Sequence, residues 1–212
     1  MTDLSYWVLF FTAALVLNLS PGPDLLYVIS RTIAQGTKVG LASAAGLWTG
    51  AFVHVLAVAF GLSTLLMTSA KAFAVVKYAG AVYLAYLGIQ ALRSRGSNFD
   101  VPASREPKVS PAQAYRQGIL VDVLNPKVAI FFMAFLPQFV RPDHGSASLQ
   151  LAGLGTLIIL VAIPVETCFV LAASRTTGFF RQHPTTSAWL DRALGSVLVT
   201  LGIRLAFFEQ QH

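Results

Sequence analysis

Two short stretches of the chain place helix breakers, capping residues and charges inside otherwise apolar runs. The first reads NLSPGPD at 18–24, and the second reads DVLNPK at 122–127. An interior proline removes a backbone donor and clashes with the preceding turn, so it frees carbonyl groups that lipid cannot satisfy. Such backbone survives within a membrane only where protein or a wet cavity surrounds it. The two stretches therefore predict a site inside the protein.

Each stretch is expected to start a half-helix near the middle of the membrane. Ser20-Pro21 and Asn125-Pro126 both pair a capping side chain with a proline at the first helical position. A helix N-terminus carries roughly half a positive charge and several free N–H groups. Two such ends at the midplane would form a site for a carboxylate, although prolines also kink helices merely for packing. The predicted substrate-binding residues are Ser20, Pro21, Gly22, Pro23, Asp24, Asn125, Pro126 and Lys127.

Opposite charges follow the two prolines. Alignment of Pro23 on Pro126 sets Asp24 opposite Lys127. An unpaired charge at the bilayer centre costs at least about 2.5 to 3.5 kcal/mol, so we expect Lys127 to pair with an acid, either Asp24 or Asp122. Two interpretations stay open at this point: a fixed ion pair that holds the halves together, or a pair that opens to bind a zwitterion.

Further ionisable residues lie deep in the apolar segments. The proton-coupling candidates are Glu166, Asp122, Asp24 and His54, and Glu166 is favoured because an intramembrane acid with no adjacent base usually handles protons or cations. His54 shares a helix face with Gly46 and Gly50, so a packing role is favoured for it. The two glycines form a GxxxG motif, which fits contact within one protomer as well as dimerisation.

The composition identifies an integral membrane protein. Of its 212 residues, 55% are hydrophobic and only 11% are charged, whereas ordinary globular domains are roughly 25% charged. The net charge of +6 arises from Lys and Arg between apolar segments. That placement indicates membrane topology and argues against nucleic-acid binding. The single cysteine, Cys168, excludes an internal disulfide and a CxxC metal or redox site.

The sequence predicts an all-α fold with six transmembrane helices. Crossing about 30 Å of hydrocarbon takes about 20 apolar residues. Proline breaks the first and the fourth of the segments that qualify. The segments are 4–30, 39–66, 72–92, 115–139, 149–173 and 187–208.

The six segments divide into two halves of three. The first repeat is 1–92 and the second is 115–212, separated by a polar linker at 93–114. An odd number of crossings makes the second half enter the membrane from the opposite side, so similar halves must be inverted repeats. They are weakly similar, since each has a Pro-broken first span and a third span that contains LGI. Inverted-topology repeats are a transporter architecture.

Basic residues predict the orientation. Those in the loops after the first, third and fifth spans outnumber those on the other side, which indicates that these loops, and the linker, are cytoplasmic. Both termini are then expected to be periplasmic. The basic residues are Arg31, Lys38, Arg93, Arg95, Arg105, Lys108, Arg116, Arg175 and Arg181, with Arg192 close behind.

Four motifs together resemble the lysine exporter family of the LysE/RhtB type. They are SPGPD after an apolar first span, GLASAAGLWTG, YAGAVYLAYLGIQALRSR and NPKVAIFFMAFLPQF. The likeness covers essentially the whole chain. The family's PGP maps to Pro21, Gly22 and Pro23, with Asp24 following, and its NPK maps to Asn125, Pro126 and Lys127.

The resemblance implies a secondary active exporter of amino acids in the bacterial inner membrane. It implies that the proton-motive force drives export and that the binding site at the midplane is open to each side in turn, by alternating access. It also implies that the protein lies in the lipid bilayer and often forms a homodimer. The sequence as a whole resembles the neutral branch of the family, which exports homoserine, threonine or leucine, more than it resembles the lysine and arginine branch. No cofactor and no metal are expected.

Two other classes of protein fit the sequence less well. A divalent metal-ion exporter of the same superfamily is the alternative, but His54, the carboxylates and Cys168 are scattered, whereas a metal site needs several ligands at coordinating spacing. An intramembrane serine protease needs a nucleophile paired with a base, and no GxSG motif occurs. We therefore expect that the protein is not an enzyme.

Overall fold

The computed structural model describes residues 3–62, 70–93, 108–175 and 184–207. All regular secondary structure in these residues is helical, which confirms the all-α prediction. The elements are α1 (Asp3–Leu19), α2 (Pro23–Gln35), α3 (Thr37–Ala57), the π-helix η1 (Val58–Leu62), α5 (Ala70–Arg93), α6 (Pro111–Val123), α7 (Pro126–Phe135), the 3₁₀ helices η3 (Leu136–Phe139) and η4 (Pro142–His144), α8 (Ala147–Arg175) and α10 (Pro184–Phe207).

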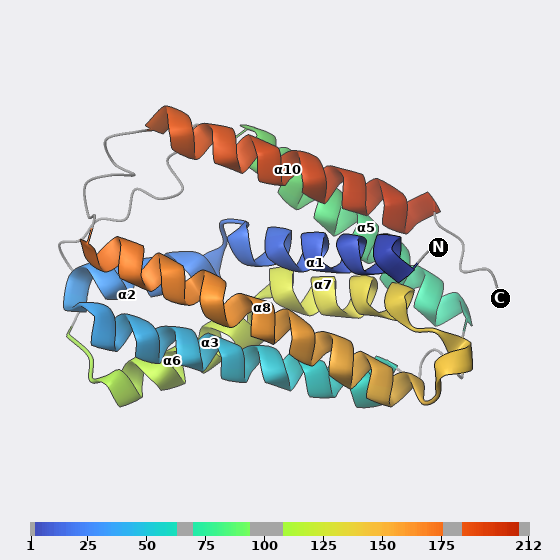
Figure 1. Ribbon diagram of the computed structural model, residues 1–212, viewed down its shortest axis with the longest axis horizontal. Helices are drawn as coiled ribbons and strands as arrows, with labels where there is room; N and C mark the ends of the chain where they lie inside the picture. The colour runs from blue at the N-terminus through green and yellow to red at the C-terminus, as the bar shows by residue number, and fades with distance from the viewer. Residues whose placement is uncertain (1–2, 63–69, 94–107, 176–183, 208–212) are drawn as a thin grey trace.

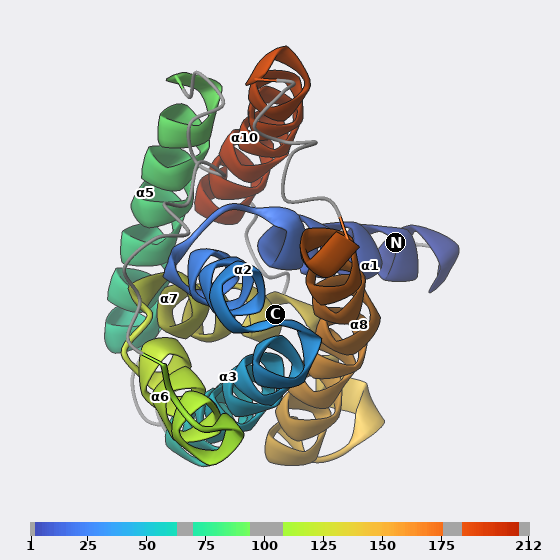
Figure 2. The ribbon, with the colours of Figure 1, turned by 90° about the vertical axis from the view of Figure 1, so that its left-hand side faces the viewer.

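The helices run along the long axis of the molecule (Figure 1). Helix α1 is continued by α2, and α6 is continued by α7, so each pair extends from one end of the bundle to the other. Helices α5 and α10 pack on each other and stand out on one side of the remaining helices (Figure 2). Helix α1 begins and α10 ends at the same end of the bundle (Figure 1).

The described residues contain between three and five candidate membrane spans. Three single helices are long and apolar enough, and two bent pairs each qualify if the pair is one span. In α10 the described apolar stretch, Arg192–Ile203, is shorter. The three single helices are Thr37–Gly61, Ala74–Arg93 and Ala147–Ser174, and the pairs are Leu4–Leu19 with Pro23–Gln35 and Pro111–Val123 with Pro126–Phe139.

The two proline breaks occur where the sequence predicts them. Each bent pair turns by 51° at its break. Pro164, in contrast, lies inside α8 without ending it. Helix α6 begins at Pro111, inside the expected linker, because the Ser110 hydroxyl and the Gln113 side chain form a reciprocal capping box. Residues 94–107 of that linker lie outside the described residues.

Glycines bring α3 against α6. A Cβ atom on Gly46 would lie 3.0 Å from the Cα of Gly118 and would meet the carbonyl oxygen of Tyr115. A Cβ on Gly50 would lie 2.9 Å from the Ile119 carbonyl oxygen. The small residues therefore allow the close backbone approach that drives helix association in lipid. Of the two interpretations of the GxxxG motif, the structure shows contact within one protomer.

Replacing Gly46 with alanine is expected to lower the free energy of unfolding by about 1 to 3 kcal/mol, as in other overpacked cores. The atoms in the way are backbone atoms of α6, which cannot move unless the helices separate. Gly153→Ala in α8 is the matched control, because a Cβ there would have nothing within 4 Å. Thermal unfolding of the two purified variants in detergent measures the difference. Equal melting temperatures would contradict the expected packing.

Candidate functional site

Lys127 connects the two breaks. Its Nζ lies 2.8 Å from Oδ2 of Asp24, and it also donates to the backbone carbonyls of Ser20 at 3.0 Å and Leu17 at 3.4 Å. The lysine side chain is only 3% exposed. An ammonium group has three donors, and here all three have acceptors in the first broken span. Of the two pairings that the sequence left open, the structure shows the one with Asp24.

The two half-helices are capped differently. Asn125 caps α7 as predicted, since its Oδ1 accepts from the Lys127 backbone N–H at 3.0 Å. The matching prediction for Ser20 is wrong. Ser20 donates its backbone N–H to the Val16 carbonyl and so belongs to the last turn of α1, whereas α2 begins at Pro23 with Gly22 as its N-cap and no side-chain cap.

Gly22 provides space at the first break. A Cβ atom at this position would lie 2.5 Å from Oδ1 of Asp24 and 2.8 Å from Nζ of Lys127. Any larger residue would therefore displace the ion pair. The backbone of Gly22 is extended, with φ of −165°, so the requirement is one of space and not of conformation.

A histidine contacts the backbone at the second break. His54 of α3 places Nε2 at 3.1 Å from the backbone carbonyl oxygen of Asp122, near the end of α6, and at 4.0 Å from its Oδ2. A carbonyl oxygen can only accept, so Nε2 carries a proton in this contact. At each break, a basic side chain from another helix thus contacts a backbone carbonyl group near the end of the first half-helix.

Glu166 of α8 is buried and held by Trp48. The indole Nε1 of Trp48 donates to Oε2 of Glu166 at 2.9 Å. Sequence reasoning missed Trp48. The signal was available, because an indole N–H inside a span needs an acceptor, and an acid is the strongest one a membrane helix can offer.

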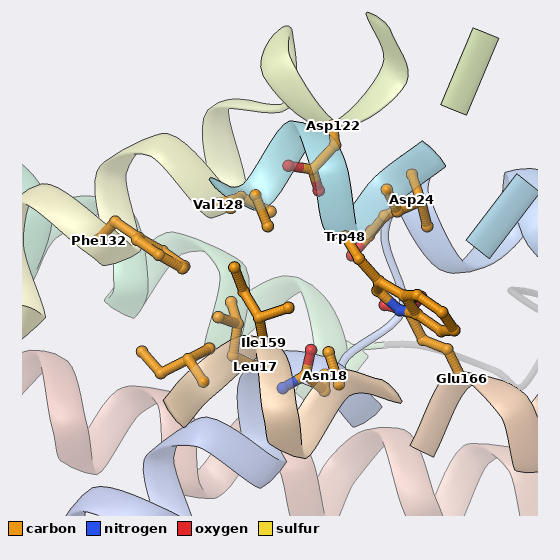
Figure 3. Close-up of a pocket in the computed structure, with 13 residues that line it drawn as sticks. Leu17, Asn18, Asp24, Trp48, Asp122, Val128, Phe132, Ile159 and Glu166 are labelled. Carbon is orange, nitrogen blue, oxygen red and sulfur yellow. The ribbon is translucent and has the colours of Figure 1, made fainter. Parts of the chain in front are cut away.

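These side chains surround one cavity, shown in Figure 3. Carboxyl groups reach it from α2, α6 and α8 and face a largely apolar wall. The space open to water is about 20 Å³, enough for about one water molecule. The residues that line it are Leu17, Asn18, Asp24, Leu47, Trp48, Ala51, Asp122, Val128, Phe132, Ile158, Ile159, Ala162 and Glu166.

Two carboxylate oxygens at the cavity lack a hydrogen-bond partner within the described part of the chain. They are Oδ1 of Asp24 and Oδ2 of Asp122, and both are buried. Most buried polar atoms in proteins are hydrogen-bonded, so each exception needs an explanation. These two oxygens are the acceptors that a bound cation, a proton or a water molecule would use.

The sequence profile of the LysE type translocator family matches residues 15–208. The chain belongs to this family. A homoserine/homoserine lactone efflux protein of Salmonella typhimurium is 33% identical over 201 residues, which are 95% of this chain and 96% of that protein. The homologue of that name in Salmonella typhi is also 33% identical with the same coverage. An uncharacterized membrane protein of Vibrio cholerae is 32% identical over 96% of this chain and 98% of its own length. No solved structure matches the chain.

Membership makes this chain a membrane translocator with a small-molecule substrate, and the efflux relatives support amino-acid export. Of the predicted binding residues, Asp24 lines the cavity, and Lys127 is connected to it through its ion pair with Asp24. Within the described residues, no three His, Cys, Asp or Glu side chains come together as a metal ion would require. The metal-exporter alternative therefore gains no support from this part of the translocator.

Proposed function

We propose that this translocator is a proton-driven exporter of amino acids with an alternating-access site between the two breaks. The observation that carries the proposal is the cavity, because three buried carboxyl groups and the Asp24–Lys127 pair lie where two half-helices meet. Buried charges of this kind mark substrate and proton pathways in membrane proteins. The residues of the two breaks, from Ser20 to Asp24 and from Asn125 to Lys127, form the proposed binding region.

The proposal includes six spans in two inverted repeats. Aligning the two LGI motifs makes Gly88 equivalent to Gly202 and Ala81 equivalent to Gly195. In the α5–α10 pair, Gly88 faces Gly195, and Gly202 faces the carbonyl oxygen of Ala81. When each residue is replaced by its equivalent in the other repeat, the first contact becomes the second. A twofold axis in the membrane plane requires this. The equal bends of the two broken pairs support the same symmetry.

Closures at both ends support alternating access. At one end, the Tyr27 hydroxyl of α2 donates to the Ala114 carbonyl of α6 at 2.7 Å, and Nη2 of Arg31 donates to Oε1 of Gln117 at 3.1 Å. At the other end, the Tyr6 hydroxyl of α1 donates to the Phe139 carbonyl at 2.7 Å. Each closure joins parts of the two broken spans. We propose them as the two gates.

Proton coupling is proposed for Glu166 first, with Asp122, Asp24 and His54 as the further candidates. A carboxyl group that lines the substrate cavity can exchange a proton for a cargo molecule, which couples the two flows. Neutral amino acids such as homoserine, threonine or leucine are the proposed cargo. Lysine or arginine would bring a second positive charge. The homodimer that the family resemblance implies stays a prediction.

Reconstituted vesicles test the function. Purified protein in liposomes, loaded with one labelled amino acid at a time, is expected to release homoserine, threonine or leucine when an inward proton gradient is imposed. Protein-free liposomes and an uncoupler are the controls. A release rate that does not depend on the proton gradient would contradict proton-driven export. Faster release of lysine than of homoserine would contradict the proposed preference for neutral amino acids.

Two cysteine variants test the proposed orientation. In a Cys168→Ser background, Asp143→Cys is expected to react with a membrane-impermeant maleimide on intact spheroplasts, whereas Lys38→Cys is expected to react only after lysis. Both positions are exposed. Lys38 lies in the first turn of α3 and Asp143 in η4, shortly before α8, and α3 and α8 begin at opposite ends of the bundle (Figure 1). The basic loops are expected inside, and the termini outside. The reverse labelling pattern would place both termini in the cytoplasm.

A further inference from the structure

An open groove follows the outer side of α5, which stands with α10 on one side of the other helices (Figure 2). Every residue that lines it belongs to α5 except Ile130 of α7, and its described lining residues are Ala, Val, Ile and Tyr, with no charged side chain. The groove has a volume of about 810 Å³. Ala74 and Ala79 are small and lie among tyrosine rings, so they leave room that larger side chains would fill. We call this surface the α5 groove.

The α5 groove has the length of one leaflet of a bilayer. The candidate span of α5 begins at Ala74, which is also the first residue of the groove, and the last groove residue on this helix is Tyr86. At a rise of 1.5 Å per residue, the helix covers about 18 Å between them. Half of a hydrocarbon core of about 30 Å is about 15 Å. The groove therefore extends from the membrane surface to just past the midplane, as the acyl chain of one lipid does.

Positive charge lies at the surface end of the α5 groove. Lys71 is exposed and lies just before the candidate span, about one helical turn above the start of the groove. The spacing of Lys71 from Val75, Tyr78 and Val82 is four, seven and eleven residues, so these residues share one face of the helix. Lys77 adds a second charge near this end, with Nζ 5.5 Å from the centroid of the Tyr78 ring. Basic side chains at this depth attract the phosphate groups of anionic lipids.

Other occupants fit the α5 groove less well. A closed dimer of this chain has a twofold axis, so a groove at that axis faces itself, and two hollows face to face stay unfilled. An unfilled hollow loses the dispersion contacts of the side chains that line it. An amino acid would place its charges against apolar walls inside the membrane, at a cost of several kcal/mol. A flexible acyl chain fills the hollow and leaves no polar group unsatisfied.

We propose that the α5 groove binds one acyl chain of an anionic phospholipid and that Lys71 holds the phosphate of its headgroup. The chain contacts α5 and, through Ile130, also α7. Ile130 lies one turn after Lys127 on α7, and α5 approaches the same helix where Gly80 meets the Cβ of Ala134. The bound lipid therefore supports the half-helix that carries Lys127 against α5, and it stabilises the folded protein.

Native mass spectrometry of the full-length protein tests the headgroup contact. The protein is delipidated in detergent and titrated with phosphatidylglycerol or with phosphatidylcholine, both with two oleoyl chains. A saturable adduct of one lipid per chain is expected, with a Kd about fivefold lower for phosphatidylglycerol, since one lysine at a membrane surface contributes about this factor. In Lys71→Gln the difference between the two lipids is expected to disappear. Lys38→Gln, at an exposed position of α3, is the matched control and is expected to keep the difference.

A second variant tests the place of the acyl chain. Ala79→Phe puts a ring into the hollow of the α5 groove, so it is expected to remove the saturable adduct of both lipids. Ala79 is exposed, and the added ring therefore does not crowd the core. Val53→Phe, at an exposed position of α3, is the matched control and is expected to keep the adduct. Phosphatidylglycerol is also expected to raise the melting temperature of the parent and of Val53→Phe but not of Ala79→Phe, because a ligand that binds the folded state stabilises it.

Three results would overturn the proposal. Equal Kd values for the two lipids in the parent protein would exclude the contact with Lys71. An adduct that persists in Ala79→Phe with an unchanged Kd would place the lipid elsewhere. A parent protein that binds no lipid but forms a dimer, which Ala79→Phe converts to a monomer, would assign the α5 groove to a second copy of the chain.

Discussion

Lys127→Met is expected to lower the free energy of unfolding by about 3 to 5 kcal/mol, the usual cost of removing one partner of a buried ion pair. Methionine fills a similar space but offers no donor. The charge of Asp24 would then lie unpaired, and the carbonyls of Ser20 and Leu17 would lose the N–H that now reaches them. Melting of the detergent-purified protein measures the loss, and export is expected to disappear with the folded protein.

The double variant Asp24→Asn with Lys127→Met separates stability from transport. Neither charge remains, so the melting temperature is expected to recover most of the loss. Export is expected to stay low, because Oδ1 of Asp24 is an acceptor at the cavity that has no hydrogen-bond partner among the described residues. A Lys127→Met protein that folds normally and transports at the parental rate would rule out an essential charge here.

Glu166→Gln is expected to abolish the dependence of export on the proton gradient and to slow export by about tenfold or more, the effect of losing one contact to a charged group. Glutamine keeps the shape of glutamate and can still accept from the Trp48 indole. It cannot take up or release a proton. Initial release rates from vesicles, measured across a series of imposed pH gradients, would rise for the parent and stay flat for the variant.

The electrostatic surroundings of Glu166 define the controls. The charges that act on it are Asp24 of α2, Asp122 of α6 and Lys127 of α7, and Trp48 of α3 donates its hydrogen bond. Trp48→Phe removes that bond but keeps the acid, so it is expected to slow export while the response to the gradient remains. A gradient response that survives in Glu166→Gln and disappears in Asp122→Asn would move the coupling role to Asp122.

Local chemistry made the breaks predictable. The proline at 126 with Asn125 before it predicted a half-helix and its cap, and both are present. The same reasoning failed for Ser20, because three consecutive helix-breaking positions follow it and allow α2 to begin at either proline. Pro164 is a proline that does not break its helix, since α8 continues through it. Proline alone therefore does not determine where a helix ends, because neighbouring helices can stabilise a continuous turn.

Contacts between distant parts of the chain were less predictable. The sequence required a partner for Lys127, but Asp24 and Asp122 were equally allowed until α2 and α7 were placed. The bond from Trp48 to Glu166 joins residues 118 positions apart. The contact of His54 with the Asp122 carbonyl joins residues 68 positions apart. Neither contact leaves a local periodicity that a sequence pattern could reveal.

By itself, the sequence determined that this protein is a helical membrane protein with two broken spans, since hydropathy, proline geometry and helix capping act within a few residues. Only the tertiary structure decided how the broken spans are joined. It placed all three donors of Lys127 on the first span and, among the described residues, left Oδ1 of Asp24 and Oδ2 of Asp122 without a hydrogen-bond partner at one cavity. The physical reason is that hydrogen bonding and charge pairing depend on distances of a few ångströms between helices, which packing alone sets.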